Sequence, residues 1–557
     1  MKGWLVAAAC VVVAAAVVAG VALGTGGKDA ADGLGAPDVI VHNGRITTLD
    51  DRNPTVQALA IRDGEIVASG TDDDVEGLAG DDTRVIDLGG RRVIPGLVDA
   101  YLHGVTKACY SRSPRFDATF KRADALREVA DRAQRTPASK WLFQLGTAWH
   151  VEQFDVSGML TREELDALAP SHPVYLQAAG FEGGQLNSRG MRMLGLRVGD
   201  PGVARGATGG ATGQVTGPAN ARALGAIDED IAALTGEEQE VCTRDFIREL
   251  NRRGLTAWDD PGGDGDFDSV SRLHRAGELN ARVRLNFSCP PETLGLACVE
   301  EITTDQIGEL GDDNLRVGGV GDEVLQTGAK GVYPPAPYRR ILTRIASSEW
   351  GFEHAAPRAT TQQGMLGEWE RVNAAAPITE LRWRMLRPGG GPTQPSPDSL
   401  ARLAALNAGV VPADIGILGG NEHPPYRGIY ESEAQACLGS GAPGAAPYAP
   451  FANLWYTISG KTYDPAQGGV REDERLSREQ ALELATKRCA WFMSLDNRIG
   501  TLAVGRLADL LVLSGDYFRV PEDEIRSLTS VLTMVGGRVV YGEGGFADLE
   551  STASTIE

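Results

Sequence analysis

Val93-Ile-Pro-Gly-Leu-Val-Asp-Ala-Tyr-Leu-His-Gly104 is the stretch that decides the fold. In a strand, residues i and i+2 point to the same side, so Tyr101 and His103 share one face. Two imidazoles at this spacing can hold one divalent cation, each nitrogen about 2.0–2.1 Å from the metal. A tyrosine titrates at about pH 10 and would have to lose its proton to replace the first imidazole. We therefore expect Tyr101 to fill space and not to bind a metal.

Short β segments at both ends of the chain predict one small sandwich. Residues 38–46 and 58–68 each read as strand, turn and strand, the second with a turn at Asp63-Gly64, and residues 508–513 and 530–541 repeat the pattern. Between them, apolar runs alternate with amphipathic stretches, which is typical of a parallel sheet with crossover helices. Helix starts are predicted at the capping boxes Thr161-Arg-Glu-Glu164 and Ser477-Arg-Glu-Gln480.

The first residues predict a membrane segment. Residues 5–23 carry no charge and approach the length of a bilayer-spanning helix. With Lys2 on the short side, the N-terminus should stay in the cytoplasm and everything after Gly24 should be exported. Small residues at 19–24 also suit a signal peptidase. We favour an uncleaved anchor over a cleaved signal, and both over a lipoprotein attached at Cys10.

The net charge argues against one class of function, and the cysteine content allows disulfide bonds. A formal net charge of -21 argues against nucleic-acid binding, which needs a basic face. An even number of cysteines follows the apolar segment, and an oxidising compartment permits disulfides among them. Cys289 and Cys298, which flank two prolines, are the first candidate pair. The six cysteines are Cys109, Cys242, Cys289, Cys298, Cys437 and Cys489.

A second signature lies near the C-terminal end of the predicted folded region: Arg498-Ile-Gly-Thr-Leu-Ala-Val-Gly-Arg-Leu-Ala-Asp-Leu-Leu-Val-Leu513. Between the two signatures, His172-Pro-Val-Tyr-Leu176 and Gly254-Leu-Thr-Ala-Trp-Asp-Asp-Pro-Gly-Gly263 occur in consistent order. The chain resembles the amidohydrolase superfamily, in the branch of N-substituted formamide deformylase-like and exoenzyme-regulator-like proteins. The resemblance implies an α/β fold, a distorted TIM (β/α)₈ barrel with its site at the carboxyl ends of the strands. It also implies a small β-sandwich formed by both ends of the chain.

Six segments follow from the resemblance and the composition. The Gly/Ala/Thr-rich residues 200–221 should form a surface excursion from the barrel. We predict a transmembrane anchor or signal segment at 1–23, a flexible linker at 24–37, the first part of the sandwich at 38–92, the barrel with insertions at 93–500, the second part of the sandwich at 501–545 and a disordered tail at 546–557.

The resemblance also implies a metal site that this sequence has largely lost. Active members hold one or two divalent metals with an HxH pair, a carboxylated lysine, two further histidines and an aspartate, and so generate a hydroxide. His103 and His354 match two of these ligands. The aspartate is the most costly loss, because removing a general base typically slows catalysis by about 10²–10⁴-fold. The four replaced positions are Tyr101, Gly321, Met385 and Gly441.

Two pocket motifs differ as well. The family's Gly-His is Phe181-Glu182 here, and its Val-His-Asp is Trp258-Asp259-Asp260. We take Glu182, Trp258 and Asp260 as pocket residues.

A rebuilt metal site is the alternative. Glu323 lies two residues after the lysine position and should face the same way. With His103, His354 and Asp259 it would make a mixed nitrogen and oxygen set suited to zinc or manganese. Glu353 should face away from the barrel interior.

Two functions remain open. The favoured one is an exported, membrane-tethered pseudoenzyme of the cell envelope that has a binding or structural role and no resident cofactor. The alternative is a hydrolase of non-peptide C–N bonds with a reduced or rebuilt zinc or manganese site. Expected partners are the membrane, through the N-terminal helix, and a small molecule in the barrel mouth. A protein partner or a second copy is a third expectation; nucleic acid is not expected. A cleaved signal would make the protein secreted.

Overall fold

The computed structural model describes fourteen stretches of the chain: residues 35–104, 108–109, 115–145, 149–179, 182–262, 267–289, 295–305, 308, 310–322, 324, 334–389, 394–418, 423–442 and 447–550. The predicted membrane segment, most of the linker, and Glu323 lie outside these residues. Across the described stretches, we find no helix with the length and apolar character needed to cross a membrane.

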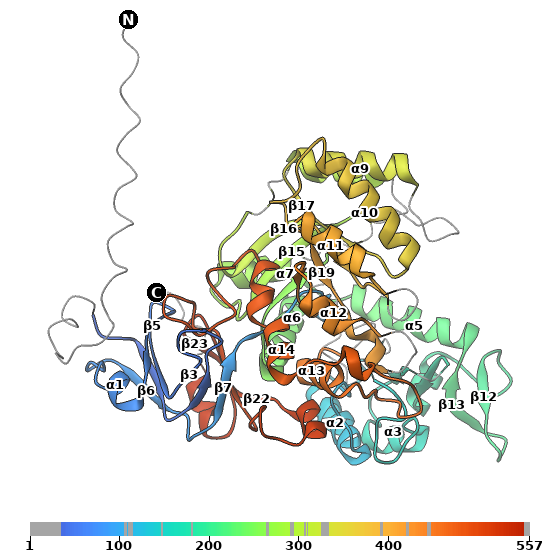
Figure 1. The fold of residues 1–557 in the computed structure, drawn as a ribbon. Helices are drawn as coiled ribbons and strands as arrows, with labels where there is room; N and C mark the ends of the chain where they lie inside the picture. Colours follow the sequence, from blue (N-terminus) through green and yellow to red (C-terminus); the bar gives the residue numbers. More distant parts are fainter. Residues whose placement is uncertain are drawn as a thin grey trace, which may run out of the picture.

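Strands from both ends of the chain build two sheets that share one hydrophobic cluster (Figure 1). β21 pairs antiparallel with β7, which joins the C-terminal strands to the N-terminal ones. The predicted Asp63-Gly64 turn connects β4 to β5, with both residues at positive φ. The four-stranded sheet contains β5 (Glu65–Gly70), β4 (Ala58–Arg62), β1 (Val39–His42) and β6 (Arg84–Asp87). The six-stranded sheet contains β23 (Arg538–Gly542), β22 (Ser530–Val535), β21 (Leu510–Leu513), β7 (Arg92–Pro95), β2 (Arg45–Thr47) and β3 (Thr55–Val56).

Part of the segment that was predicted to be a disordered tail is ordered and packs against the sandwich. Residues 546–549, predicted to be disordered, belong to the 3-10 helix η7 (Gly544–Leu549). Phe546 is buried in the sandwich cluster, and this apolar contact holds the segment.

Eight parallel strands form a curled sheet of the TIM-barrel type, which we call the barrel sheet (Figure 1). The predicted eight-stranded parallel sheet is therefore confirmed. In spatial order it contains β8 (Leu97–Asp99), β14 (Leu255–Asp260), β15 (Arg282–Ser288), β16 (Leu315–Gly321), β17 (Gly351–Ala355), β18 (Arg384–Leu386), β19 (Gly409–Val411) and β20 (Gln435–Ala436).

Helices between successive strands cover the outside of the barrel sheet, and the main hydrophobic cluster contains side chains from both layers. The covering helices are α6 (Gly236–Arg253), α7 (Phe267–Arg275), α8 (Gly295–Asp305), α9 (Pro335–Ser347), α10 (Ala359–Asn373), α11 (Pro397–Ala405) and α12 (Tyr426–Glu431). Later come α13 (Pro450–Ser459), α14 (Arg478–Leu484) and the 3-10 helices η3 (Asp414–Leu418), η4 (Glu472–Glu474), η5 (Lys487–Trp491) and η6 (Glu522–Ser527).

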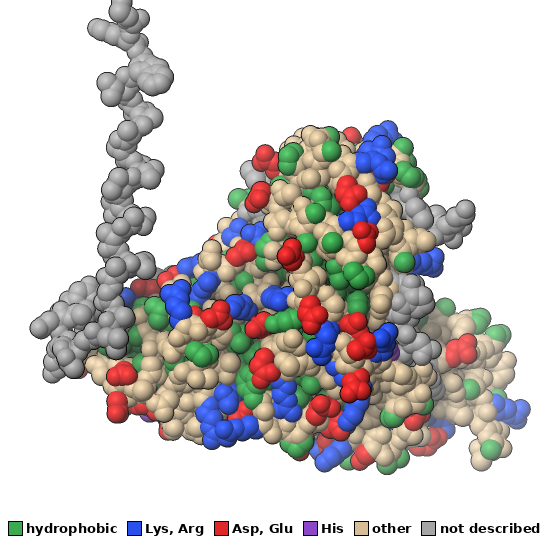
Figure 2. Space-filling model, viewed as in Figure 1, with side chains coloured by type: hydrophobic (Ala, Val, Ile, Leu, Met, Phe, Trp, Pro, Cys, Tyr) green, Lys and Arg blue, Asp and Glu red, His purple; other side chains and the backbone are tan. Residues whose placement is uncertain are grey.

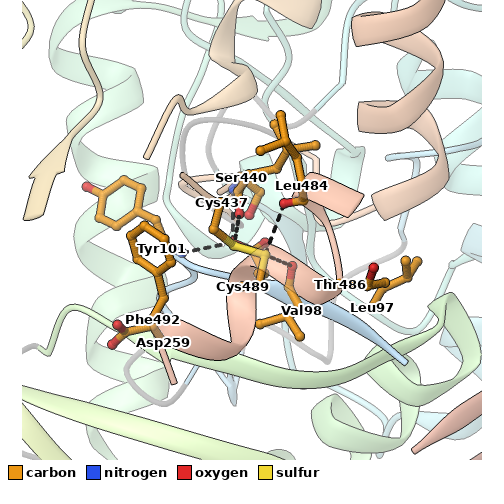
Figure 3. The surroundings of a disulfide bond; sticks show 12 residues. Leu97, Val98, Tyr101, Asp259, Cys437, Ser440, Leu484, Thr486, Cys489 and Phe492 are labelled. Carbon is orange, nitrogen blue, oxygen red and sulfur yellow. Dashed lines mark hydrogen bonds between the residues drawn. A yellow bond between two sulfur atoms is a disulfide. The ribbon is translucent and has the colours of Figure 1, made fainter. Parts of the chain in front are cut away.

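The two edges of the barrel sheet meet at β8 and the segment after β20. The amide of Ala100 donates to the carbonyl of Leu438 at 3.0 Å, and Leu102 forms a parallel bridge with Ala442. A disulfide between Cys437 and Cys489 ties this edge to η5 (Figure 3). Hydrogen bonds thus close the seam, and a covalent bond fixes one of its edges to η5.

A separate five-stranded sheet lies outside the barrel sheet. The Gly/Ala/Thr-rich segment forms the hairpin β12–β13, which lies at the opposite end of the molecule from the sandwich in Figure 1. The sheet contains β12 (Val203–Arg205), β13 (Ala211–Val215), β11 (Gly184–Leu186), β10 (Val174–Leu176) and β9 (Leu142–Gln144). The remaining helices are α1 (Asp72–Glu76), α2 (Arg122–Arg135), α3 (Arg162–Leu168), α4 (Ser188–Met193) and α5 (Gly217–Ala232).

Several local predictions are confirmed. Both capping boxes form, with Thr161 before α3 and Ser477 before α14. The predicted Cys289–Cys298 disulfide is present. Acidic and basic side chains are interspersed over the face seen in Figure 2, so the net charge of -21 is not gathered into one patch on that face.

Candidate functional site

Tyr101 sits inside the barrel sheet, just past the end of β8. Its side chain is 2% exposed, and its hydroxyl donates to Oδ2 of Asp322 at 2.7 Å. Burial, together with the negative charge of Asp322, raises the pKa of Tyr101 well above its ordinary value. The phenol therefore stays protonated and acts as a hydrogen-bond donor, which an anionic metal ligand cannot do.

Gly441, at the position of the expected aspartate, lies directly across the seam from Tyr101. Its amide donates to the carbonyl of Tyr101 at 2.7 Å, and its φ of 68° is one that glycine adopts easily. The amide of His103 donates to the carbonyl of Ala442 at 2.9 Å, and the His103 ring lies 5.2 Å from the Tyr101 ring. The structure thus brings Tyr101, His103 and Gly441 together at one end of the barrel sheet.

Asp259 is the centre of a buried group of charged side chains. Its Oδ2 accepts hydrogen bonds from Nη1 of Arg384 and, at 3.2 Å, from Nη1 of Arg284. Its Oδ1 accepts from Nδ2 of Asn286 at 2.6 Å. All four side chains are buried. We call these four residues, with Glu353, the interior ion-pair cluster.

Glu353 faces the barrel interior, so the prediction that it faces away was wrong. Its Oε2 lies 3.8 Å from Nε of Arg384. A Cβ added to Gly321 would come within 2.3 Å of Cγ of Glu353, so Glu353 occupies the space that a side chain at Gly321 would need. The reason is strand alternation: the neighbouring residues of β17 face the apolar helix layer and leave Glu353 on the inner side.

His354 lies on the opposite side of β17 from Glu353. Its Nδ1 is 2.9 Å from the hydroxyl of Tyr338 on α9, and its ring is 5.3 Å from that of Phe352. Complete burial lowers the pKa of His354 to about 3, so the imidazole is neutral. A neutral imidazole can bind metal, but this one packs among the covering helices while Asp259 lies in the barrel interior.

The remaining predicted residues are spread over several environments. Met385 is buried in the main hydrophobic cluster. Nε1 of Trp258 donates to Oδ2 of Asp260 at 3.4 Å, and Oδ1 of Asp260 accepts from the amide of Gly262 at 3.1 Å. Glu182 is exposed and precedes β11, outside the barrel sheet.

Comparison with known proteins places the chain in a family. The Amidohydrolase family (Amidohydro_3) matches residues 84–541. The chain belongs to this family. It is 24% identical over 555 residues to the N-substituted formamide deformylase of Arthrobacter pascens, covering 91% of this chain and 99% of that protein. Over a shorter stretch, 29% of this chain and 35% of the relative, it is 24% identical to the exoenzymes regulatory protein AepA of Pectobacterium carotovorum.

Solved structures agree on the fold. A metal-dependent hydrolase from Pyrococcus furiosus superposes with a TM-score of 0.58 at 19% identity, covering 86% of this chain and all of that one. The resemblance to the amidohydrolase family, in the formamide deformylase-like branch, is therefore confirmed.

The described residues do not fit the metal centre that the amidohydrolase family implies. Asp259 has two guanidinium partners, and Arg387 lies close enough to the Tyr101 hydroxyl to oppose the rise of its pKa. Three arginines near the expected metal position would repel a divalent cation. The predicted ligands His354 and Asp259 are not brought together, and the proposed set of four stays a prediction because Glu323 is outside the described residues.

A different group of ligand-type side chains lies on the sandwich. Ligand atoms of His42, Asp72 and Glu76 lie within 4.8 Å of one another. In the described part of the chain, this is the one group of three or more His, Cys, Asp or Glu side chains close enough to share a metal ion. His42 Nδ1 lies 2.5 Å from Oε1 of Glu76.

The interior arginines were missed by sequence reasoning, although a signal was present. In β15, the sequence Arg282-Val-Arg-Leu-Asn286 alternates polar and apolar residues, and all the polar ones are buried. Alternation in a buried strand indicates that its polar residues share the inner face. Arg282, one step below the interior ion-pair cluster, binds both carboxylate oxygens of Asp509 at 2.6 and 2.8 Å and fixes the barrel floor to the sandwich.

Glu353→Gln should remove a pH-dependent cost. Burial raises the pKa of Glu353 well above its ordinary value, although Arg284 opposes the rise. The folded protein then keeps a proton that the unfolded chain loses above about pH 4.3, so wild-type stability falls as pH rises beyond that value. We expect the variant to be stabilised relative to wild type more at pH 8 than at pH 5, on the order of 1 kcal/mol or more. Denaturant unfolding at both pH values measures this.

The control for this variant is Glu380→Gln, at an exposed position. It should behave like wild type at both pH values. An equal response of the two variants would contradict a buried, protonated Glu353.

Proposed function

We propose that this member of the amidohydrolase family has lost, or strongly reduced, metal-dependent hydrolysis of amide-type C–N bonds, and serves as a binding or structural protein of the cell envelope. One observation carries the proposal: the carboxylate of Asp259 is bound by the guanidinium groups of Arg284 and Arg384 and not left available to a metal ion. Removing a charge from a buried pair is costly, so releasing Asp259 for metal binding would leave two buried guanidiniums unpaired.

The remaining positions support the same proposal. Gly441 cannot accept a proton from an attacking water, and Gly321 cannot form a carbamate. Glu353 occupies the space beside Gly321. Inherited catalysis would need a metal-activated hydroxide and a base, and the described residues supply neither.

The alternative proposal is a hydrolase of non-peptide C–N bonds with a rebuilt zinc or manganese site. It is favoured by His103, which remains half-buried at the carboxyl end of β8, where barrels of this type hold their sites. Glu323 would be its natural partner.

Metal content separates the two proposals. We expect the purified protein to carry substoichiometric zinc and manganese by mass spectrometry, and to show no turnover of N-formyl amines, with an active deformylase as the positive control. A His42→Ala variant removes the surface group of His42, Asp72 and Glu76. If near-stoichiometric metal survives in His42→Ala but disappears in His103→Ala, the pseudoenzyme proposal is wrong.

We also propose that the folded part lies outside the cytoplasm, tethered by the apolar N-terminal segment. Two disulfides, Cys289–Cys298 and Cys437–Cys489, support export, because such bonds persist in oxidising compartments. The protein should stay in the membrane pellet after alkaline carbonate extraction. Quantitative release into the supernatant would rule out the tether. We further propose that the barrel mouth binds a small molecule and that the protein associates with a protein partner or with a second copy of itself.

A further inference from the structure

A cavity of about 520 Å³ lies between α2 and α6, away from the interior ion-pair cluster. This volume falls within the range of small-molecule sites. Its lining comes from both helices, from the loops before α6 and after α2, and from Arg115. No residue of the interior ion-pair cluster contributes to it.

Arg115 supplies a buried cation to this cavity. The side chain is 5% exposed, and its guanidinium lies 4.7 Å from the ring centre of Tyr448 and 5.6 Å from that of Phe246. Its Nη2 is buried, and within the described part of the chain it has no hydrogen-bond partner. Both carboxylate oxygens of Asp117, a charge that acts on Arg115 from nearby, also lack hydrogen bonds there, so the two do not bond to each other. A buried N–H of this kind is costly unless something accepts from it.

The other lining groups favour an anion with an apolar body. Leu234, Val241 and Phe246 provide apolar walls. Five basic residues line the cavity against four acidic ones, in a protein whose net charge is -21. The basic residues are Arg115, Arg132, Arg135, Lys140 and Arg248, and the acidic ones are Glu237, Glu238, Asp245 and Glu249.

Most of the acidic charge in the lining is already compensated. Glu249 is bound by Arg252 at 2.6 Å and Arg253 at 2.9 Å. Glu238 closes the capping box at the start of α6. Asp245 lies among arginines whose charges oppose the rise that burial causes in its pKa. Among the lining side chains, Nη2 of Arg115 is therefore the buried donor for which the described part of the chain shows no acceptor.

We propose that this cavity binds a small organic carboxylate. Its carboxylate would pair with the guanidinium of Arg115, a residue of the cavity lining, since a guanidinium matches carboxylate geometry. Its apolar body would pack against Leu234, Val241 and Phe246. This is a second site, independent of the barrel interior and of whether the barrel binds metal.

Calorimetry on the full chain tests this site with benzoate, hexanoate and octanoate as probes, and with benzamide and hexanamide as uncharged matches. We expect at least one carboxylate to bind at millimolar concentration and its amide to bind at least about tenfold more weakly, because a charge-assisted hydrogen bond is lost. Arg115→Gln should weaken carboxylate binding by at least about tenfold. The matched control is Arg127→Gln on α2, whose side chain is 71% exposed and pairs with Asp124; it should bind like wild type.

Val241→Trp gives a second test that leaves Arg115 untouched. Val241 is 47% exposed and lines the cavity, so a larger side chain there should block binding without changing the thermal unfolding midpoint. If Arg115→Gln does not fold, this variant decides. Absence of binding by all three carboxylates, equal binding of the amides, or binding that survives in the folded variants would overturn the proposal.

Discussion

Asp259→Ala is expected to lower the free energy of unfolding by about 3–5 kcal/mol, because removing one partner of a buried ion pair leaves the other charge uncompensated. Here two guanidiniums, those of Arg284 and Arg384, would lose their shared acceptor in a site closed to solvent. Asn286 would lose an acceptor as well. Denaturant unfolding followed by tryptophan fluorescence measures the change, since many of the nine tryptophans are buried.

Asp268→Ala is the matched control. Its side chain is 84% exposed and lies 3.8 Å from Arg272, so the loss should be under about 1 kcal/mol. Replacing the whole charged group, as Arg284→Met/Asp259→Leu/Arg384→Met, should recover much of the stability, because hydrophobic residues of similar volume can replace a buried ion pair. A small loss in Asp259→Ala would mean that water reaches the two arginines.

Removing the Cys437–Cys489 disulfide should have the second large effect. The bond spans 52 residues, and the chain-entropy model assigns about 4 kcal/mol to a loop of that length. It also holds the segment that supplies the Phe492 carbonyl to Nη1 of Arg384, at 3.2 Å. Figure 3 shows the bond beside Tyr101 and Phe492, in the barrel interior.

The second disulfide provides the comparison. Cys289–Cys298 spans only nine residues, for which the same model gives about 2.5 kcal/mol. We expect Cys437→Ala/Cys489→Ala to be the less stable of the two double variants, by denaturant unfolding without reductant. Equal losses would show that loop length does not govern their contributions.

Much of the fold could be predicted from local patterns. Capping boxes at Thr161 and Ser477 and the Asp63-Gly64 turn depend on neighbouring residues alone, and all three form. The separate sheet of β9–β13 was not predicted as such, because pairing between short strands depends on contacts that a sequence pattern does not specify.

The site was harder to predict than the fold. Loss of a ligand at Tyr101, Gly321 and Gly441 is a prediction that the sequence alone can make, since it concerns which residue occupies each position. Which face of β17 turns inward is not visible, because Glu353 and His354 are adjacent and a shift of one residue exchanges their sides. The error about Glu353 has this origin.

The sequence by itself determined the eight-stranded barrel sheet, the end-joined sheet and the family, because these depend on residue identity and periodicity, and it predicts that four inherited ligands are replaced. Only the tertiary structure decided what replaced them. Arg284, Arg384 and Asp259 come from three strands and become partners when the barrel sheet closes around them. Burial then makes an unpaired charge too costly, so each must bind another.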